Sequence, residues 1–463
     1  MIALRPYQRD LLDRVRASYR AGNRRVLMVL PTGGGKTCIF SHIAHASAAK
    51  NTRVLILAHR CELIDQICAA LEQFDVQPDV IAPAHQRCRS NVCVASVPSL
   101  IRRLELERPP DLIICDEAHH AARSGHATGA NSWGRIFLHF KNARHLGVTA
   151  TPIRLDSRGL AEFFDDIVCG PQVHELQALG FLAPLRIFAP ESVDTSGLHH
   201  RGGDFNAEES EALVNRRAIT GSALEHYTRL APGKRALIFT ISIAHAAAVA
   251  AQFREAGYAA VYLSGQTARP LRREAVADFQ SGRLQVLVSC DLFSEGFDCP
   301  GAEVGIMLRP TMSLAMYRQQ VGRILRSAPG KTALLFDHVG NTTMHGLPDE
   351  PIEWSLTFDG RARRASSPGV KVCPQCFAAL PQSARRCDHC GHEFTVSKPR
   401  DIDEEAGELV ELTPEMRERR EARREQGRAQ SLEQLREFAK MKGYAPRWAD
   451  HVWQARQAKR ERA

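Results

Sequence analysis

Residues Pro31–Thr37 place three successive glycines before a lysine and a threonine. The apolar run Val26–Leu30 precedes this loop and a helical pattern opens at Lys36, so the loop joins a strand to a helix N-terminus. Backbone N–H groups in such a loop can surround phosphate oxygens, with Lys36 reaching the β and γ phosphates and Thr37 ligating Mg²⁺. The predicted phosphate-binding residues are Thr32, Gly33, Gly34, Gly35, Lys36 and Thr37.

A glycine-rich turn on its own is usually only a turn. The strict form of the phosphate-binding pattern would also have glycine at position 30, where this chain has Leu30. The strand before the loop and the helix after it nevertheless favour a phosphate site.

Two adjacent carboxylates, Asp116 and Glu117, follow the apolar run Leu112–Cys115. The carboxyl end of such a strand is the edge at which parallel α/β sheets hold their ligands. We expect Asp116 to hold a Mg²⁺ ion, and Glu117 to orient and deprotonate a water molecule. An exposed acidic pair is the simpler interpretation of Asp-Glu alone, but its position after a phosphate loop favours the catalytic one.

Far along the chain, a helical pattern carries Gln319, Arg323 and Arg326. Two arginines three residues apart usually form a solvated helix face. Rigid guanidinium groups are, however, well suited to stabilise the charge that accumulates on a γ-phosphoryl group in transfer. If they are supplied by a different domain from the phosphate loop, hydrolysis requires that the two domains close.

Four of the 13 cysteines form two Cys-x-x-Cys pairs separated by ten residues. Two such pairs in a short segment predict a structural Zn²⁺ site, with His389 or His392 as a less favoured substitute ligand and a redox disulfide as the other interpretation of either pair. The basic flanks suit phosphate binding, and a small protein-docking module is an equal alternative. The predicted zinc ligands are Cys373, Cys376, Cys387 and Cys390.

Short apolar runs recur between helical patterns, which is typical of parallel α/β sheets. The first group of expected strands comprises Val26–Leu30, Val54–Ala58, Val92–Ala95, Leu112–Cys115 and Leu146–Thr149. After an expected irregular stretch from Pro184 to Ala231, the second group comprises Ala236–Thr240, Ala259–Leu263, Gln285–Ser289, Val304–Leu308 and Ala333–Phe336. The fold class is therefore α/β, with two similar parallel-sheet domains in tandem.

We expect an ATP-binding domain over residues 1–175, a second α/β domain over 176–345, a linker over 346–370, a zinc ribbon over 371–396 and a charged, partly helical tail over 397–463. Residues Thr413–Arg428 carry a helical charge pattern. The segment Gly443–Trp448 and Trp453 mix aromatic and cationic side chains, which could grip nucleic acid, pack on the two large domains or contact a partner protein.

Length and composition limit the number of domains and the class of protein. The 463 residues are 44% hydrophobic, enough for two or three domains with cores. The first residues lack the apolar run of a signal peptide, no segment has the length of a membrane span, and nine cysteines are scattered, so we expect a cytoplasmic protein. The net charge of +9 favours a polyanionic partner, and residues 414–463 hold 14 lysines and arginines against 8 acidic residues.

The phosphate loop, Asp116–His119 and Gln319–Arg326, in this order, make the chain similar to superfamily 2 helicases of the DEAD/DEAH-box type over roughly residues 1–340. This resemblance implies two RecA-like domains, ATP and Mg²⁺, and roles for Arg323 and Arg326 as arginine fingers. It also places Gly296 and Asp298 near the nucleotide. Arg5 and Gln8 match the motif that reads adenine.

The resemblance also implies nucleic-acid contacts, mainly to the backbone. Thr149–Pro152 matches the motif that couples hydrolysis to strand movement. The implied contact residues are His59, Arg60, Ser96, Thr149 and Thr151 in the first domain, and Thr240 and Ser264 in the second.

Within the family, Met307–Thr311, Tyr317–Arg326 and Ala328–Thr332 resemble the RadD-like bacterial DNA-repair ATPases and their phage-encoded relatives. His120 after the acidic box departs from the pattern, and the ribbon and tail look shorter than those of a chromosomal repair member. The resemblance implies an ATP-dependent DNA helicase or translocase in repair, recombination or phage DNA metabolism. DNA is favoured over RNA as its partner, with a protein partner at the ribbon or tail also considered.

Two alternatives are a DNA-stimulated ATPase that remodels protein without separating strands, and an RNA helicase. A third, a binding protein with a degenerate motor, is disfavoured by the complete set of predicted ATP-site residues. A monomer is expected, because each chain carries both halves of the ATP site.

Overall fold

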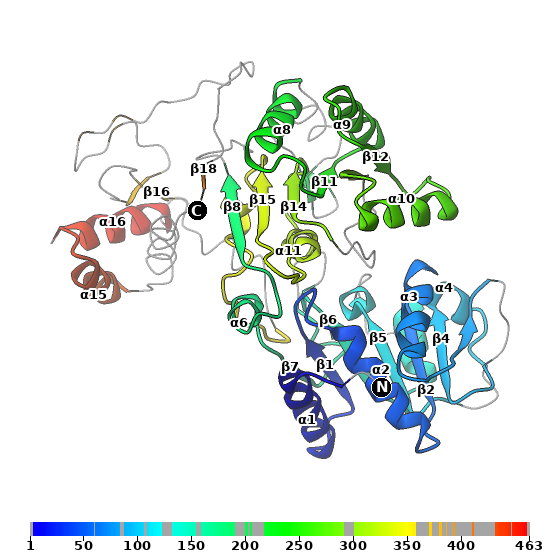
Figure 1. The fold of residues 1–463 in the computed structure, drawn as a ribbon. Coiled ribbons are helices and arrows are strands. Elements are labelled where there is room, and N and C mark those ends of the chain that lie inside the picture. Colours follow the sequence, from blue (N-terminus) through cyan, green and yellow to red (C-terminus); the bar gives the residue numbers. More distant parts are fainter. Residues whose placement is uncertain are drawn as a thin grey trace. The chain divides into compact units, whose positions relative to one another are not determined.

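The computed structural model describes residues 3–59, 61–83, 88–105, 109–122, 132–153, 159–189, 200–201, 204–205, 217–290, 301–357, 370–372, 379–381, 386, 391, 393, 410–411, 431–445 and 447–460. The chain divides into two compact units (Figure 1). One unit comprises residues 1–358 with 408–410, and the other comprises residues 359–407 with 411–463. Each described residue of the predicted ATP site lies in the first unit.

The first sheet of this unit has seven strands in the order β3-β4-β2-β5-β6-β1-β7, and all its pairings are parallel. Its strands are β1 (Arg25–Val29), β2 (Val54–Ala58), β3 (Asp79–Ile81), β4 (Val92–Ser96), β5 (Leu112–Asp116), β6 (Arg144–Thr149) and β7 (Asp166–Cys169). Its helical segments are α1 (Pro6–Arg20), α2 (Lys36–Ala48), α3 (Cys61–Glu72), α4 (Val97–Leu100), a 3₁₀ turn (Ala118–Ala122) and α5 (Ser132–His139).

Both faces of the first sheet are buried. In β1, Val26 and Met28 join one apolar cluster with helices α1, α2 and α3, whereas Leu27 and Val29 join the other with α5. Successive side chains of a strand point to opposite faces, so a strand buried on both faces is apolar throughout. This explains why the central strands form continuous apolar runs in the sequence.

The second sheet follows helix α6 (Val173–Ala178) and has the order β12-β13-β11-β14-β15-β8-β18. Its strands are β8 (Leu185–Ala189), β11 (Ala236–Thr240), β12 (Ala260–Leu263), β13 (Val286–Cys290), β14 (Val304–Met307), β15 (Ala333–Asp337) and β18 (Val410–Glu411). Its helices are α8 (Arg217–Leu230), α9 (Ile243–Glu255), α10 (Arg269–Ser281), α11 (Leu314–Ile324) and α12 (Asn341–His345). The short strands β9 (His200–Arg201) and β10 (Asp204–Phe205) pair with each other.

The expected class, two parallel α/β domains of RecA-like type, is confirmed by these two sheets. All ten expected strands form, with ends that differ by at most two residues. The expectation of an irregular stretch from Pro184 to Ala231 is wrong at both ends, where β8 and α8 form. Strand β8 pairs with β15, so its apolar side chains are buried in the second sheet.

In the second unit, β16 (Val370–Val372) pairs antiparallel with β17 (Ala379–Pro381), and helices α15 (Leu432–Lys442) and α16 (Trp448–Arg460) contact each other. Tyr444 and Trp448 pack with Phe438, and Trp448 is 3% exposed. These aromatic residues therefore form a core within their own unit. The helix expected over Thr413–Arg428 and the four predicted zinc ligands lie outside the described residues. Among the helices that are described, none is long and apolar enough to cross a membrane.

Candidate nucleotide-binding site

The phosphate loop lies between β1 and α2, as the sequence predicts. Leu30 N donates to Thr149 O (3.0 Å), which anchors the loop's start to the end of β6. Gly35 precedes α2 with φ +85°, and a Cβ there would lie 2.4 Å from Gln8 Nε2. Only glycine fits this conformation and this space without a rearrangement. The loop is thus shaped so that its backbone can approach a ligand closely.

Gln8 braces the loop. Its Nε2 donates to Gly34 O (3.1 Å), its Oε1 accepts from Arg5 N (2.9 Å), and Tyr7 Oη donates to the same Gly34 carbonyl (2.8 Å). The Arg5 guanidinium lies 4.5 Å from the ring centre of Phe181. The start of α1 therefore fixes the phosphate loop. Adenine recognition by Arg5 and Gln8 stays a prediction.

Lys36 is half-buried behind the loop, where its Nζ donates to Leu30 O (3.3 Å). Burial lowers the pKa of Lys36, the Glu117 and Asp116 carboxylates raise it, and Arg323 and Arg326 lower it. The structure thus places the lysine, the two carboxylates and the two arginines close enough to interact. A cluster of largely buried cations and carboxylates fits a phosphate group bound together with a divalent cation.

Asp116 ends β5 and Glu117 follows it, and each is 7% exposed. Burial raises the pKa of Asp116 to about 7, the Glu117 charge adds to this rise, and Lys36 opposes it. Glu117 has φ +48°, a left-handed conformation that costs about 1–3 kcal/mol in residues other than glycine. Strained backbone of this kind is concentrated at functional sites, where it aims a side chain.

His119 joins this carboxylate pair to the end of β6. Its Nδ1 lies 3.1 Å from Thr149 Oγ1 and 3.5 Å from Glu117 Oε2. Thr149 Oγ1 in turn donates to Thr151 O (3.1 Å) and accepts from Thr151 N (3.2 Å). A change at Glu117 can therefore reach the Thr149–Thr151 segment through one imidazole ring.

A row of three histidine rings, tilted against one another, continues this connection. The His120 ring centre lies 4.4 Å from that of His119 and 4.3 Å from that of His59. His59 is a predicted nucleic-acid contact at the end of β2. Sequence reasoning gave His119 and His120 no role, although the His-His pair directly after the acidic box was a visible signal.

Three other predicted nucleic-acid contacts have hydroxyl groups buried within the chain. Ser96 Oγ caps α4 by accepting from Ser99 N (3.2 Å), and Thr240 Oγ1 donates to Ser289 O (3.0 Å). Ser264 Oγ accepts from Gln266 N (3.2 Å). These side chains shape the strand ends on which they lie, and direct contacts with nucleic acid stay predictions. The positions Arg60, Gly296 and Asp298 lie outside the described residues.

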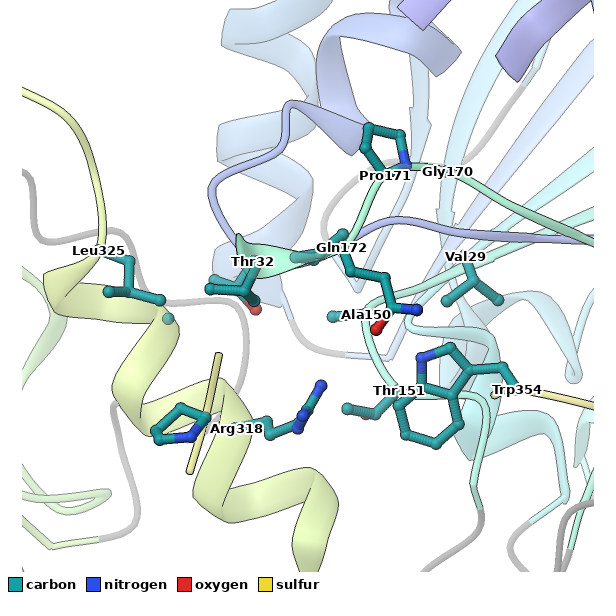
Figure 2. Close-up of a pocket in the computed structure, with 14 residues that line it drawn as sticks. Val29, Thr32, Ala150, Thr151, Gly170, Pro171, Gln172, Arg318, Leu325 and Trp354 are labelled. Carbon is teal, nitrogen blue, oxygen red and sulfur yellow. The ribbon is translucent and has the colours of Figure 1, made fainter. Parts of the chain in front are cut away.

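Helix α11 brings the second sheet's residues to the phosphate loop. Ser313 Oγ caps it by accepting from Met316 N (3.2 Å), and Gln319 and Arg323 are 2% and 7% exposed. A Cβ on Gly322 would lie 2.4 Å from Thr32 Cβ, and one on Gly33 would lie 3.9 Å from Arg326 Cγ. Thr32, Thr151 and Arg318 line a small cavity of about 30 Å³ beside this contact (Figure 2). The site is therefore built from both sheets.

Comparison with family profiles finds three matches. Residues 1–154 match "Type III restriction enzyme, res subunit", and residues 220–328 match "Helicase conserved C-terminal domain". Residues 371–396 match "Uncharacterised protein family UPF0547". The first match covers β1 to β6, the second covers β11 to β14, and the third covers the segment predicted to be a zinc ribbon.

Three relatives share most of the chain. A "51.5 kDa protein" of a Lactococcus phage is 34% identical over 80% of this chain and 78% of its own length. IRC3 of Saccharomyces cerevisiae, named as a candidate ATP-dependent helicase, is 32% identical over 77% of this chain, which spans 54% of IRC3. The "DNA 3'-5' translocase XPB2" of Sulfurisphaera tokodaii is 25% identical over 74% of this chain and 82% of its own.

The fold is also similar to a solved fragment of a candidate HsdR subunit of a type I restriction enzyme from Vibrio vulnificus. The TM-score is 0.59 at 22% identity, over 75% of this chain and 67% of the other. Taken with the phosphate loop, the buried Asp116–Glu117 pair and the arginines of α11, the relatives and profiles show that this chain belongs to the superfamily 2 helicases of DEAD/DEAH type, which are nucleic-acid-dependent ATPases.

Proposed function

We propose that this protein is an ATP-dependent DNA translocase or helicase whose ATP site opens and closes between its two sheets. The observation that carries this proposal is the contact of α11 with the phosphate loop, where Gly322 meets Thr32. In the same region, the charges of Arg323 and Arg326 lower the pKa of Lys36. An ATP site shared by two domains converts nucleotide binding and hydrolysis into a change in their spacing. Residues 1–175 and 176–345 are the proposed halves.

In this proposal each group has a defined task. Lys36 and the loop N–H groups bind the β and γ phosphates, and Glu117 orients the attacking water and takes its proton. Gln319 and Arg323 face the γ-phosphoryl group from α11, and Arg326 faces it from just beyond the end of that helix. Thr37 and Asp116 would hold Mg²⁺, which neutralises charge on the β and γ phosphate oxygens when bound. The raised pKa of Asp116 fits this assignment, because a divalent cation stabilises a buried carboxylate as the anion.

DNA is the nucleic acid along which we propose that the protein moves. The name of the XPB2 relative describes a translocase on DNA, and the net charge of +9 suits a polyanion. His59 and the Thr149–Thr151 segment, which the row of histidine rings connects with Glu117, are proposed to pass the state of the ATP site to the bound strand. Each chain holds both halves of the ATP site, so a monomer is the proposed functional form.

A structural Zn²⁺ site in the second unit is a separate proposal. Strands β16 and β17 pair antiparallel on either side of positions 373–378, which include Cys373 and Cys376. Arg386 and Glu393 form an antiparallel bridge on either side of positions 387–392, which include Cys387 and Cys390. Each Cys-x-x-Cys pair is thus bracketed by antiparallel partners, which is the arrangement of a zinc ribbon. No metal-binding cluster occurs among the described residues, and these cysteines are outside them.

The test of the proposed function is steady-state ATP hydrolysis without nucleic acid, then with single-stranded DNA, duplex or forked DNA, or RNA, each with Lys36→Ala as a control. We expect strong stimulation by DNA. Stimulation by RNA alone would instead assign an RNA helicase. Stimulation by forked DNA that stays paired in a strand-separation assay would assign a translocase that remodels bound protein.

A further inference from the structure

The segment that follows the second sheet returns to the first one. After β15 and α12, residues 347–357, here called the return segment, bind the first sheet's domain through three hydrogen bonds. Gln172 and Ile352 exchange two hydrogen bonds, Ile352 N to Gln172 Oε1 (2.8 Å) and Gln172 Nε2 to Ile352 O (3.2 Å). Ala161 N donates to Leu356 O (3.1 Å).

Alternate side chains of the return segment face inward, as in a strand with one buried face. Ile352 is buried, and Trp354 and Leu356 are half-buried against the apolar cluster that includes Leu160 and Phe163. The intervening Glu353 is exposed. The segment is therefore docked on the first domain by side chains as well as by its backbone.

The same segment also holds α11. Arg318 Nη2 donates to Glu350 O (2.7 Å), and the Arg318 guanidinium lies 5.9 Å from the centre of the Trp354 ring. Just before the segment, Tyr317 Oη donates to Gly346 O (3.1 Å), and the Tyr317 ring stacks on His345 (5.4 Å between centres). The start of α11 is thus fixed to a part of the chain that is itself fixed to the first domain.

Arg318 precedes Gln319 directly and Arg323 by five residues on a rigid helix, so a shift at Arg318 moves the two predicted catalytic residues with it. Figure 2 shows Arg318 and Trp354 directed toward Thr151 at the edge of the small cavity. The cavity has room for one or two water molecules, so the contact is close without being fully packed.

We propose that Trp354 and Arg318 are positioning residues that set the distance and angle at which α11 presents Arg323 to the phosphate loop. Neither side chain is assigned a contact with nucleotide. The return segment acts as a short tether between the two sheets, so that α11 approaches and leaves the ATP site along a restricted path. This inference rests on the proposed ATP hydrolysis at the site.

The test compares Trp354→Ala, Trp354→Phe and the exposed neighbour Glu353→Ala in the full-length protein. The kinetic readout is the DNA-stimulated hydrolysis rate as a function of ATP concentration. Because a displacement of about 1 Å in a catalytic group can cost about 10²-fold in rate, we expect Trp354→Ala to lose at least about tenfold in kcat. Trp354→Phe keeps a ring beside Arg318 and should stay within about threefold, and Glu353→Ala within about twofold.

Thermal unfolding of each variant separates positioning from stability. If Trp354→Ala unfolds at the assay temperature, Arg318→Lys replaces it, because lysine keeps the charge but lacks the planar guanidinium that packs on the ring. A folded Trp354→Ala or Arg318→Lys protein with wild-type kcat would overturn the inference. So would a loss of stability that leaves kcat unchanged in the folded fraction.

Tryptophan fluorescence provides a second readout that does not depend on turnover. A non-hydrolysable ATP analogue is expected to change the emission of the wild-type protein, and this change should disappear in Trp354→Phe. An unchanged response in Trp354→Phe, or no response in the wild type, would contradict a moving contact at Trp354. Wild-type protein that hydrolyses no ATP under any condition would instead refute the proposed function.

Discussion

At the scale of single residues, the proposed ATP site concentrates charge on side chains that are largely buried. Lys36 is half-buried near Asp116 and Glu117, which are buried, and buried Arg323 reaches the same region from α11. Hydrogen bonds and charges in such a site stabilise a transition state strongly, because they are already oriented and weakly screened. Removing one of them should therefore affect turnover far more than folding.

Lys36→Ala and Glu117→Gln are each expected to lower ATP hydrolysis by about 10²-fold or more. Lys36→Ala removes the phosphate ligand, whereas Glu117→Gln removes the base but keeps the side chain's size. Lys50→Ala, an exposed lysine just beyond the end of α2, is the matched control. Steady-state hydrolysis measures all three, and normal turnover in either of the first two would refute these assignments.

His145 in β6 provides a pH-dependent prediction away from the catalytic site. It is 3% exposed, and burial lowers its pKa to about 4, with the nearby charge of Arg25 also lowering it. In the unfolded chain a histidine titrates near pH 6.5. Between pH 6.5 and 4 the unfolded chain therefore binds more protons, and folding stability falls as the pH falls.

His145→Gln should remove this contribution, which is at most about 3 kcal/mol across that range. The measurement is the free energy of unfolding at several pH values between 7 and 4, in wild type and variant. The slope with pH is the quantity to compare, because the substitution also changes packing against Phe137. An identical slope in both proteins would show that His145 titrates normally.

At the scale of elements, the order of the strands in the first sheet, rather than their number, decides which residues lie together at the proposed ATP site. β1, β5 and β6 are neighbours in the first sheet, so the phosphate loop, Asp116 and Thr149 emerge at one edge. The second sheet contributes a helix, α11, whose N-terminal serine cap fixes where the helix begins. The position of Arg323 thus depends on a cap ten residues before it.

Removal of that cap should weaken both stability and catalysis. Ser313→Ala is expected to cost about 1 kcal/mol of stability and to lower ATP turnover, because the first turn of α11 frays. Ser431→Ala removes the equivalent cap of α15 in the second unit, at a similar cost. Unfolding curves and hydrolysis rates of both variants test this, and equal effects on turnover would show that α11 needs no cap for its catalytic role.

Elements with a strong local signal were predictable from sequence. β2 and β11 are five-residue apolar runs buried on both faces, and their predicted bounds are those observed. β3 is only three residues long, and β8 follows a proline in a stretch of mixed composition, so neither has a distinct pattern. The contact of Trp354 with Arg318 has no local signal at all, because the return segment is recognised only through its distant partners.

At the scale of the whole molecule, two compact units have separate cores. The ATP site and the return segment belong to the first, whereas the proposed zinc site and the aromatic cluster around Trp448 belong to the second. The predicted ribbon, residues 371–396, is a short segment, and a segment below about 40 residues usually requires a metal or a disulfide to fold. Removal of the metal should therefore destabilise the second unit and leave the stability of the first unit unchanged.

Metal analysis of the purified protein is expected to find one zinc ion per chain. Cys387→Ser or a zinc-selective chelator should remove it and abolish the unfolding transition of the second unit, while the first unit keeps its own transition. Lys371→Ala, beside the cysteines but not a proposed ligand, is the control. Protein without zinc would refute the ribbon, and one shared unfolding transition would refute the separation.

Gly322 fits against Thr32 with no space for one additional carbon atom. This contact therefore limits how closely α11 can approach the phosphate loop. A single methyl group, in Gly322→Ala, would act as a wedge between α11 and the phosphate loop without altering any charged group. The distance between α11 and the phosphate loop is thus set by the hydrogen atom that glycine carries in place of a side chain, and a methyl group at this position would force the two apart.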